Sequence, residues 1–229
     1  MALWLKIVLG CSVIVVVILA IVANVILRKK AKALRQRIIE QTQQETYLEL
    51  SKLRDDIGHL SFALKNEVKN NYKPYDVEAA INTVFTNDFQ NILVVDKSDL
   101  FLLNSIAQKT KRKTYYLSEY FDQNTQNALA AKYPDDFTNV HLLPYNMETI
   151  DFVVVFENDF SLMEIYEKYW HFMSERSMMM ILLTKYKNKE IKSFVKKMQE
   201  HNYPMEISYV ESKFLYLVKK QESKKNTIV

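Results

Sequence analysis

Glycine is nearly absent from this sequence of 229 residues, in which Gly10 and Gly58 are the only two. Average usage is about 7 per cent, so the long region after Gly58 is far from an ordinary composition. Phosphate-binding loops such as G-x-G-x-x-G and the P-loop depend on glycine, because their backbone must approach the ligand closely. We therefore exclude kinases, P-loop ATPases and ordinary dinucleotide-dependent enzymes.

Reactive and metal-binding side chains are also scarce. Cys11 is the single cysteine, so no disulfide can form within the chain. The four histidines, at positions 59, 141, 171 and 201, show no metal-ligand spacing, and we expect no metal. There is no serine nucleophile elbow. The net charge of +4 is mild and no basic stripe is interleaved with aromatic residues, so we expect no nucleic-acid partner.

One long apolar run is present, over residues 7–27, and it contains no charged residue. A membrane-spanning helix needs about 20 apolar residues. A cleaved signal peptide would have a shorter apolar core and a clear small-residue cleavage site. A buried core helix that is apolar all round does not suit a domain of this size. We therefore predict a transmembrane anchor over residues 1–28, in contact with membrane lipid through 7–27.

The charges that flank this run predict its orientation. Lys6 is the only charged side chain before it, whereas residues 28–37 contain six basic ones: Arg28, Lys29, Lys30, Lys32, Arg35 and Arg37. Positive charge is retained on the cytoplasmic side of a membrane. The sequence thus predicts a single-pass protein of the cell membrane with its C-terminal domain in the cytoplasm. The basic cluster 28–37 can also bind anionic lipid headgroups.

Residues 29–73 are predicted to form a helical juxtamembrane stalk. From Lys29 to Asp56 the composition favours helix, with no proline or glycine, and apolar residues recur without a regular heptad. A second amphipathic segment follows, from His59 to Val68, before Asn70-Asn71-Tyr72-Lys73-Pro74. A coiled coil that would make the chain a homo-oligomer through the stalk stays open as an alternative.

Beyond Pro74, apolar runs alternate with helical segments. The runs that predict strands cover residues 92–95, 114–117, 140–143, 151–156 and 178–183. Helices are predicted over 76–85, 100–109, 123–132, 162–173 and 189–201, and Ser98-Asp99 is expected to cap the second of them. Strands that are wholly apolar and separated by helices indicate a parallel sheet covered on both faces.

The last two predicted strands, 206–210 and 213–219, are joined only by Glu211-Ser212 and should pair as an antiparallel hairpin. The predicted fold class is therefore α/β: a Rossmann-like, doubly wound domain over residues 74–220 that ends in a β-hairpin. Residues 221–229 are expected to form a disordered basic tail.

This order of elements resembles that of the class I S-adenosylmethionine-dependent methyltransferases. Asp151-Phe152 through Glu157-Asn158-Asp159 matches the fourth strand of that family and the polar residues that end it. Val94-Val95-Asp96-Lys97-Ser98 takes the place of its first strand and glycine-rich turn, without the glycines. The anchor, the stalk and the glycine-poor domain are together similar to membrane-anchored methyltransferases of mollicutes. The resemblance covers residues 76–220.

The resemblance implies S-adenosylmethionine as the cofactor. It places Asp96, Ser98, Glu119 and Asn146 in the cofactor site, where Glu119 would bind the ribose hydroxyls. Ligands of open α/β sheets bind beyond the carboxyl ends of the strands, where these residues would converge. Glu157 and Asp159 would lie near the transferred methyl group, as a base for acceptors that lose a proton.

Two questions stay open at this level. The link from Leu143 to Ile150 is about six residues, whereas a parallel crossover usually needs a dozen or more. Either the third strand is displaced or this link is a loop without a helix. The function likewise stays open: an active methyltransferase with a membrane-proximal substrate, or a non-catalytic scaffold at the inner face of the membrane. A third alternative, a lipid-surface or oligomerising stalk protein, rests only on the basic cluster and the stalk.

Overall fold

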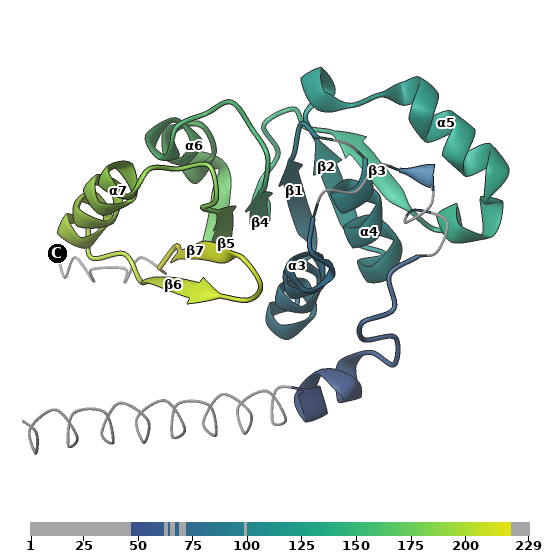
Figure 1. Cartoon of the computed structure of the whole chain (residues 1–229), viewed down its shortest axis with the longest axis horizontal. Coiled ribbons are helices and arrows are strands. Elements are labelled where there is room, and N and C mark those ends of the chain that lie inside the picture. Colours follow the sequence, from purple (N-terminus) through teal and green to yellow (C-terminus); the bar gives the residue numbers. More distant parts are fainter. Residues whose placement is uncertain (1–46, 62–63, 65–66, 69–71, 99, 221–229) are drawn as a thin grey trace, which may run out of the picture. The chain divides into compact units, whose positions relative to one another are not determined.

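The computed structural model describes residues 47–61, 64, 67–68, 72–98 and 100–220 (Figure 1). The chain divides into two compact units, Met1–Lys52 and Leu53–Val229. In the first unit the described residues, 47–52, are helical. The predicted anchor 1–28, the basic cluster 28–37 and the tail 221–229 lie outside the described residues. Within the described part of the chain, no helix has the length and hydropathy that a membrane span requires.

Seven strands in the second unit form one sheet, in the order β3-β2-β1-β4-β5-β7-β6. Strands β1 to β5 run parallel to one another, and β7 pairs antiparallel with both β5 and β6. This confirms the predicted mixed sheet with a C-terminal hairpin. The strands are β1 Asn91–Val95, β2 Lys113–Tyr116, β3 His141–Pro144, β4 Ile150–Val155, β5 Met173–Leu182, β6 Met205–Tyr209 and β7 Lys213–Val218.

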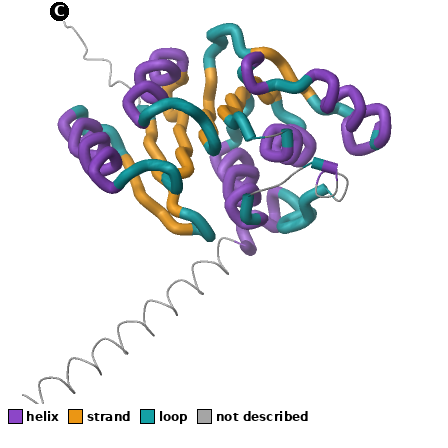
Figure 2. The backbone as a smooth tube through the Cα atoms, turned by 45° about the horizontal axis from the view of Figure 1, so that its top comes forward, coloured by secondary structure: helices purple, strands orange, loops and turns teal. Residues whose placement is uncertain are grey.

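Helices cover both faces of the sheet (Figure 2). They are α3 Pro74–Asn87, α4 Phe101–Thr110, α5 Gln123–Lys132, α6 Leu162–Tyr169 and α7 Asn188–Glu200, with short 3-10 turns η1 Ser118–Tyr120, η2 Pro134–Phe137 and η3 Trp170–Phe172. One core cluster joins the sheet to α3, α4 and Leu129 of α5. The other joins it to α6 and α7.

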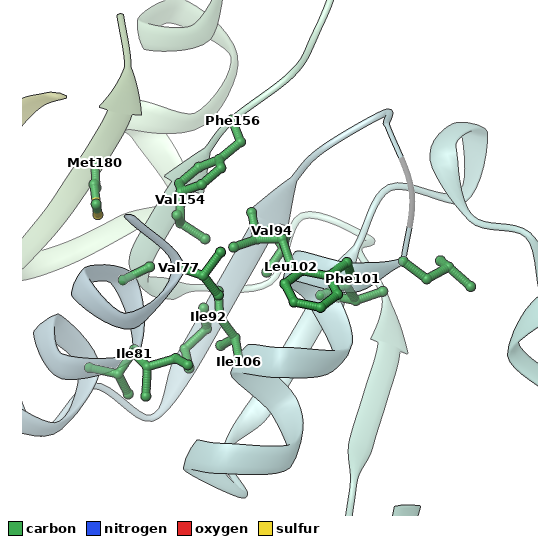
Figure 3. Close-up of a cluster of buried hydrophobic side chains, with 14 of the residues drawn as sticks. Val77, Ile81, Ile92, Val94, Phe101, Leu102, Ile106, Val154, Phe156 and Met180 are labelled. Atoms are coloured by element: carbon green, nitrogen blue, oxygen red, sulfur yellow. The ribbon is translucent and has the colours of Figure 1, made fainter. Parts of the chain in front are cut away.

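The central strands are mostly apolar because both faces of the sheet are covered there. In β1, Ile92 and Val94 face α3 and α4, while Leu93 and Val95 belong to the opposite cluster. Figure 3 shows the first of these clusters, where Val154 of β4 and Met180 of β5 join the side chains from the two helices. Alternation along a strand thus places successive apolar residues in two separate cores.

Part of the segment predicted as stalk packs within the second unit. Arg54, only 7% exposed, forms ion pairs with Asp56 at 2.7 Å and with Glu78 of α3 at 2.8 Å. Lys109 of α4 also pairs with Asp56, at 2.7 Å. Leu60 and Leu64 add apolar contacts to the first core cluster. Arg54 and Asp56 are therefore held to α3 and α4 by a partly buried charge network.

Two predicted helix boundaries were wrong. Helix α4 begins at Phe101 with Leu100 as its N-cap, and no side chain caps it; the Ser98 hydroxyl instead bonds to Asp96. The predicted helix 162–173 ends at Tyr169, and Met173 already belongs to β5. The cause is a long-range contact, because Lys219 at the end of β7 donates to the carbonyls of Trp170 and Met173.

The short link between β3 and β4 is a loop without a helix, which answers the question that the sequence left open. Strand β3 is not displaced; it lies at the edge of the sheet beside β2. Tyr145 in this loop covers the part of the sheet that a crossover helix would otherwise cover. Its ring packs edge-on against Tyr115 and Tyr169. One face of the sheet is thus covered by three helices and the other by two and this loop.

Left-handed backbone occurs here without glycine. Six described residues other than glycine have positive φ: Asp88, Lys111, Asn139, Met147, Arg176 and Asn202. Asp88 and Lys111 are the C-caps of α3 and α4, a position that glycine usually occupies. A Cβ in this conformation costs about 1–2 kcal/mol per residue.

We predict that Lys111→Gly will be more stable than Lys111→Ala by about 1 kcal/mol, because only the alanine keeps the strained Cβ. Urea unfolding of the full chain measures the difference. The same pair of substitutions at Lys113, in β2, is the control and should rank in the opposite order, since glycine weakens a strand. Equal stability of the two Lys111 variants would contradict the prediction.

Candidate functional site

The predicted site residues all follow the carboxyl ends of strands. Strand order departs in opposite directions from β1 and β4, and open α/β sheets bind ligands at such a switch point. The structure places Asp96 and Ser98 after β1, Glu119 in η1 after β2, Asn146 after β3, and Glu157 and Asp159 after β4. They therefore share one edge of the sheet, as the topology requires.

Asp96 is the most buried of these residues, with 7% exposure. Its Oδ1 accepts hydrogen bonds from the Tyr72 hydroxyl at 2.6 Å, the Ser98 hydroxyl at 3.0 Å and the Ser98 backbone N–H at 3.2 Å. The Tyr72 and Ser98 oxygens are themselves 2.7 Å apart. The structure thus brings Asp96 and Ser98 together, with a tyrosine that the sequence analysis did not single out.

Tyr72 reaches this edge from the segment that precedes α3. Its ring packs edge-on against Phe156, with centroids 4.9 Å apart, which fixes its position over the end of β1. Burial, and then the negative charge of Asp96, raise the pKa of the Tyr72 hydroxyl well above its usual value. The hydroxyl therefore stays protonated at physiological pH and can donate to Asp96.

The loops after β1 and β4 bind each other. Lys97 donates its backbone N–H to the Glu157 carbonyl at 2.8 Å, and its ammonium forms a close ion pair with Asp159. The hydrogen bond from this ammonium to Asp159 raises the pKa of Lys97. The Glu157 side chain itself is exposed. Of the two candidate bases, Asp159 is therefore already paired within the protein, and Glu157 faces solvent.

A second lysine, Lys185 in the loop after β5, donates hydrogen bonds to oxygen atoms in the loop after β4. Lys185 donates to the Asn158 side-chain oxygen at 2.7 Å and to the Phe160 carbonyl at 2.9 Å. Asn158 is only 3% exposed. Burial lowers the pKa of Lys185. Among the described residues, no group of histidine, cysteine or acidic side chains is arranged to hold a metal ion.

Glu119 and Asn146 lie farther along the edge, and both are exposed. The backbone N–H of Asn146 donates to the Glu148 carboxylate at 2.7 Å. Strand β2 separates β3, which Asn146 follows, from β1. Glu119 is closer to the centre, next to Tyr120, whose pKa is raised by burial and then by Asp159. No contact described here joins Asn146 to Asp96.

The space between the ends of β1 and β2 is filled by side chains. Its volume is about 10 Å³, and its walls include Asp96, Leu100, Leu103, Tyr116, Tyr120 and Phe121. The Phe121 ring stacks on Tyr116 with centroids 3.7 Å apart. A cavity of this size holds about one water molecule. Phe121 gave no signal in the sequence, because its role depends on how η1 folds back over β2.

A larger pocket, of about 600 Å³, opens near the amino end of β5 and is lined by Trp170, His171, Tyr203 and Lys219, among others. Trp170 is 4% exposed and contacts Tyr203 at 4.7 Å between ring centroids. The Lys219 ammonium is engaged by two backbone carbonyls. This pocket lies at the opposite ends of the strands from the polar residues described above.

No family model matches the sequence, and no curated protein matches it either. Solved structures do match. A candidate O-methyltransferase from Klebsiella pneumoniae superimposes with a TM-score of 0.51 at 6% identity, over 70% of this chain and 91% of that one. The SAH-bound methyltransferase of Podospora anserina gives 0.50 at 10% identity, over 80% and 97%. At such identities the likeness shows the fold alone, which is the Rossmann-like fold of class I methyltransferases.

Tyr72→Phe should lower the free energy of unfolding by about 1–3 kcal/mol, because Asp96 loses a buried hydrogen-bond donor. Urea unfolding of the full chain measures this loss. Tyr75→Phe is the matched control: Tyr75 is 66% exposed, and its variant should stay within about 0.5 kcal/mol of the parent. Equal losses in the two variants would show that the Tyr72 hydroxyl does not stabilise this edge.

Proposed function

We propose that this chain is a membrane-tethered methyltransferase that binds S-adenosylmethionine at the carboxyl edge of β1 and β2. The observation that carries the proposal is the strand order, in which β7 lies antiparallel between β5 and β6 at the end of a parallel sheet. The two solved structures reported above are described as an O-methyltransferase and a methyltransferase, and the second is SAH-bound.

Three residues are proposed to hold the cofactor directly. Asp96 and Ser98 form a polar turn beyond β1, and Glu119 presents an exposed carboxylate beyond β2. A carboxylate can accept two hydrogen bonds from a ribose diol, and charge-assisted bonds of this kind are strong. Asn146 borders the same edge. Glu157 is proposed as the base ahead of Asp159, because Lys97 already pairs with Asp159.

As the side chains stand, the cofactor does not fit. Sites for ligands of this size have volumes of about 300–1,000 Å³, whereas the cavity between the ends of β1 and β2 has about 10 Å³. Phe121 is one of the side chains that line this cavity. It belongs to the loop after η1 and is only half-buried, so it can leave without disturbing a strand.

The free energy needed to move Phe121 lowers the expected affinity for the cofactor. Burying a phenylalanine side chain contributes about 1.5–3 kcal/mol, and a stacked aromatic pair about 0.5–1.5 kcal/mol beyond that. Because Phe121 is half-buried, moving it should cost roughly 1.3–3 kcal/mol. Since 1.4 kcal/mol changes an equilibrium constant tenfold, this cost weakens binding by roughly 10- to 150-fold.

The small cavity also favours a second candidate function, in which the domain is a non-catalytic scaffold that no longer binds the cofactor. Both candidates retain the fold and the tether, so neither can be chosen from topology. They differ in what removal of Phe121 should do.

Phe121→Ala should tighten the binding of S-adenosylmethionine by roughly 10- to 100-fold, because the Phe121 ring then no longer has to be moved off Tyr116. Isothermal titration calorimetry of the full chain in detergent measures the affinity. Phe137→Ala, at another half-buried phenylalanine in η2, is the matched control and should leave the affinity unchanged. If neither the parent chain nor Phe121→Ala gives heat at millimolar ligand, the domain is the scaffold.

Adding Glu119→Gln to Phe121→Ala tests the ribose contact. A hydrogen bond to a charged group contributes about 1.5–3 kcal/mol, so binding should weaken by roughly tenfold or more. Glu175→Gln in the same background is the control, because the exposed Glu175 lies in β5, near the opposite end of the strands. Equal affinities would remove Glu119 from the site.

The tether is proposed from residues 7–27 and from the basic cluster that follows them. If it spans a bilayer, substrates must be reachable from the membrane surface, and the methyl acceptor is a membrane-proximal molecule. Stable anchoring by a spanning helix is effectively irreversible, unlike adsorption through charge.

We predict that the full chain, produced in cells, will stay with the membrane fraction through an alkaline carbonate wash, since the apolar span and not charge holds it. Immunoblots of the washed pellet and supernatant measure this retention. A variant that lacks residues 1–27 should be released by the wash. Release of the full chain would contradict a spanning anchor.

A further inference from the structure

Strand β6, Met205–Tyr209, is the last strand of the sheet (Figure 1). It pairs with β7 on one side, and no strand among the described residues pairs with its other side. An edge strand presents a row of backbone N–H and C=O groups that can pair with another chain. The outer side of β6 therefore carries backbone donors and acceptors that can form directional hydrogen bonds with another strand.

The hydrogen bonds to β7 show which residues of β6 face outward. Val210 donates its N–H to Ser212, and Val218 donates to the Pro204 carbonyl. Because antiparallel ladders alternate, the even-numbered residues of β6 bond inward to β7. The backbone groups of Met205, Ile207 and Tyr209 therefore point away from the sheet.

These outward residues carry none of the usual protection against pairing. Edge strands are commonly shortened or carry proline, lysine or other charges. The opposite edge, β3, has four residues and ends in Pro144. In β6 the residues with outward backbone groups are uncharged and apolar or aromatic, and Ile207 and Tyr209 are 37% and 71% exposed.

We propose that a second copy of this chain pairs antiparallel with β6, about a two-fold axis that passes between the two Ile207 residues. In this register Ile207 faces Ile207 of the other copy, and Met205 faces Tyr209. All three outward residues then form hydrogen-bonded pairs, and two seven-stranded sheets become one continuous sheet. The interface is isologous, as in most homodimers.

Charge selects this register over its neighbours. Glu206 faces Ser208 of the other copy, so no like charges meet. A shift that centres the axis on Glu206 places two glutamates directly opposite each other, which destabilises a strand pair. A shift that centres it on Ser208 moves Met205 out to Glu211, beyond the end of the strand. The Ile207 register alone uses the whole of β6.

The side chains support the same arrangement. Met205 and Ile207 lie opposite Leu217 and Leu215 of β7, which belong to the core cluster under α6 and α7. Pairing across β6 would continue this apolar face from one copy to the other and cover the exposed Ile207. Met205 would meet the Tyr209 ring, a favourable contact between sulfur and an aromatic ring.

Disulfide trapping in the full chain tests the register. In a Cys11→Ser background, one preparation carries Glu206→Cys and another carries Ser208→Cys. Facing residues in a non-hydrogen-bonded pair have Cα atoms about 4.5 Å apart, within disulfide range, whereas diagonal neighbours are about 7–8 Å apart. Mixing the two preparations and oxidising should give on the order of tenfold more disulfide-linked dimer than either preparation alone.

A third variant connects the trapped dimer to the proposed axis. Adding Ile207→Lys to both preparations should abolish the mixed disulfide, because two ammonium groups would meet at the axis; Tyr75→Lys, at an exposed residue of α3, should not. Equal yields in mixed and single preparations, as association through the stalk alone would give, overturn the proposal. So does a mixed yield that Ile207→Lys leaves unchanged.

Discussion

The pairing of β1 with β4 does not stop where the two strands end. Phe156 donates its N–H to the Val95 carbonyl, Lys97 donates to the Glu157 carbonyl, and the Lys97 ammonium then reaches Asp159. Strand order reverses between these strands, which is where open α/β sheets bind ligands. In this protein the two loops at the switch point bind each other. Any ligand that binds at this edge must therefore compete with contacts that the fold already makes.

The lack of glycine explains why the edge closes in this way. A glycine turn leaves backbone amides facing an open space, whereas Ser98 in the matching turn brings a hydroxyl that binds Asp96 and Tyr72. The same shortage forces side chains such as Lys111 into left-handed backbone elsewhere. A domain with no glycine beyond Gly58 can keep the topology of an open α/β sheet, but side chains occupy the space that glycine turns would otherwise leave.

The sequence predicted the sheet well because the buried strands contain continuous apolar runs, and because every crossover between parallel strands except the loop from β3 to β4 contains a helix. Residues 151–156 and the link Glu211-Ser212 were sufficient for β4 and the hairpin. The carboxyl-end positions of Asp96 and Glu157 followed from the same topology. Their surroundings did not, because Tyr72 lies 24 residues from Asp96, and Lys97 lies 62 residues from Asp159. Such contacts leave no periodic pattern in the sequence. The hydrogen bonds from Lys219 to the carbonyls of Trp170 and Met173, at the start of β5, leave none either.

The carboxyl edge of the sheet and the edge strand β6 differ in how far their polar groups are already bonded within the protein. At the carboxyl edge, Lys97 pairs with the Asp159 carboxylate and Lys185 donates to the Asn158 side-chain oxygen. These oxygen atoms, which a ligand would meet, are therefore already bonded. At β6, three successive outward residues leave backbone groups available to another chain. A polar group can contribute to recognition only when the fold has not already satisfied it. By that criterion the carboxyl edge would have to rearrange before it could bind the proposed cofactor, whereas the outward backbone groups of β6 would pair with the proposed second copy without rearrangement.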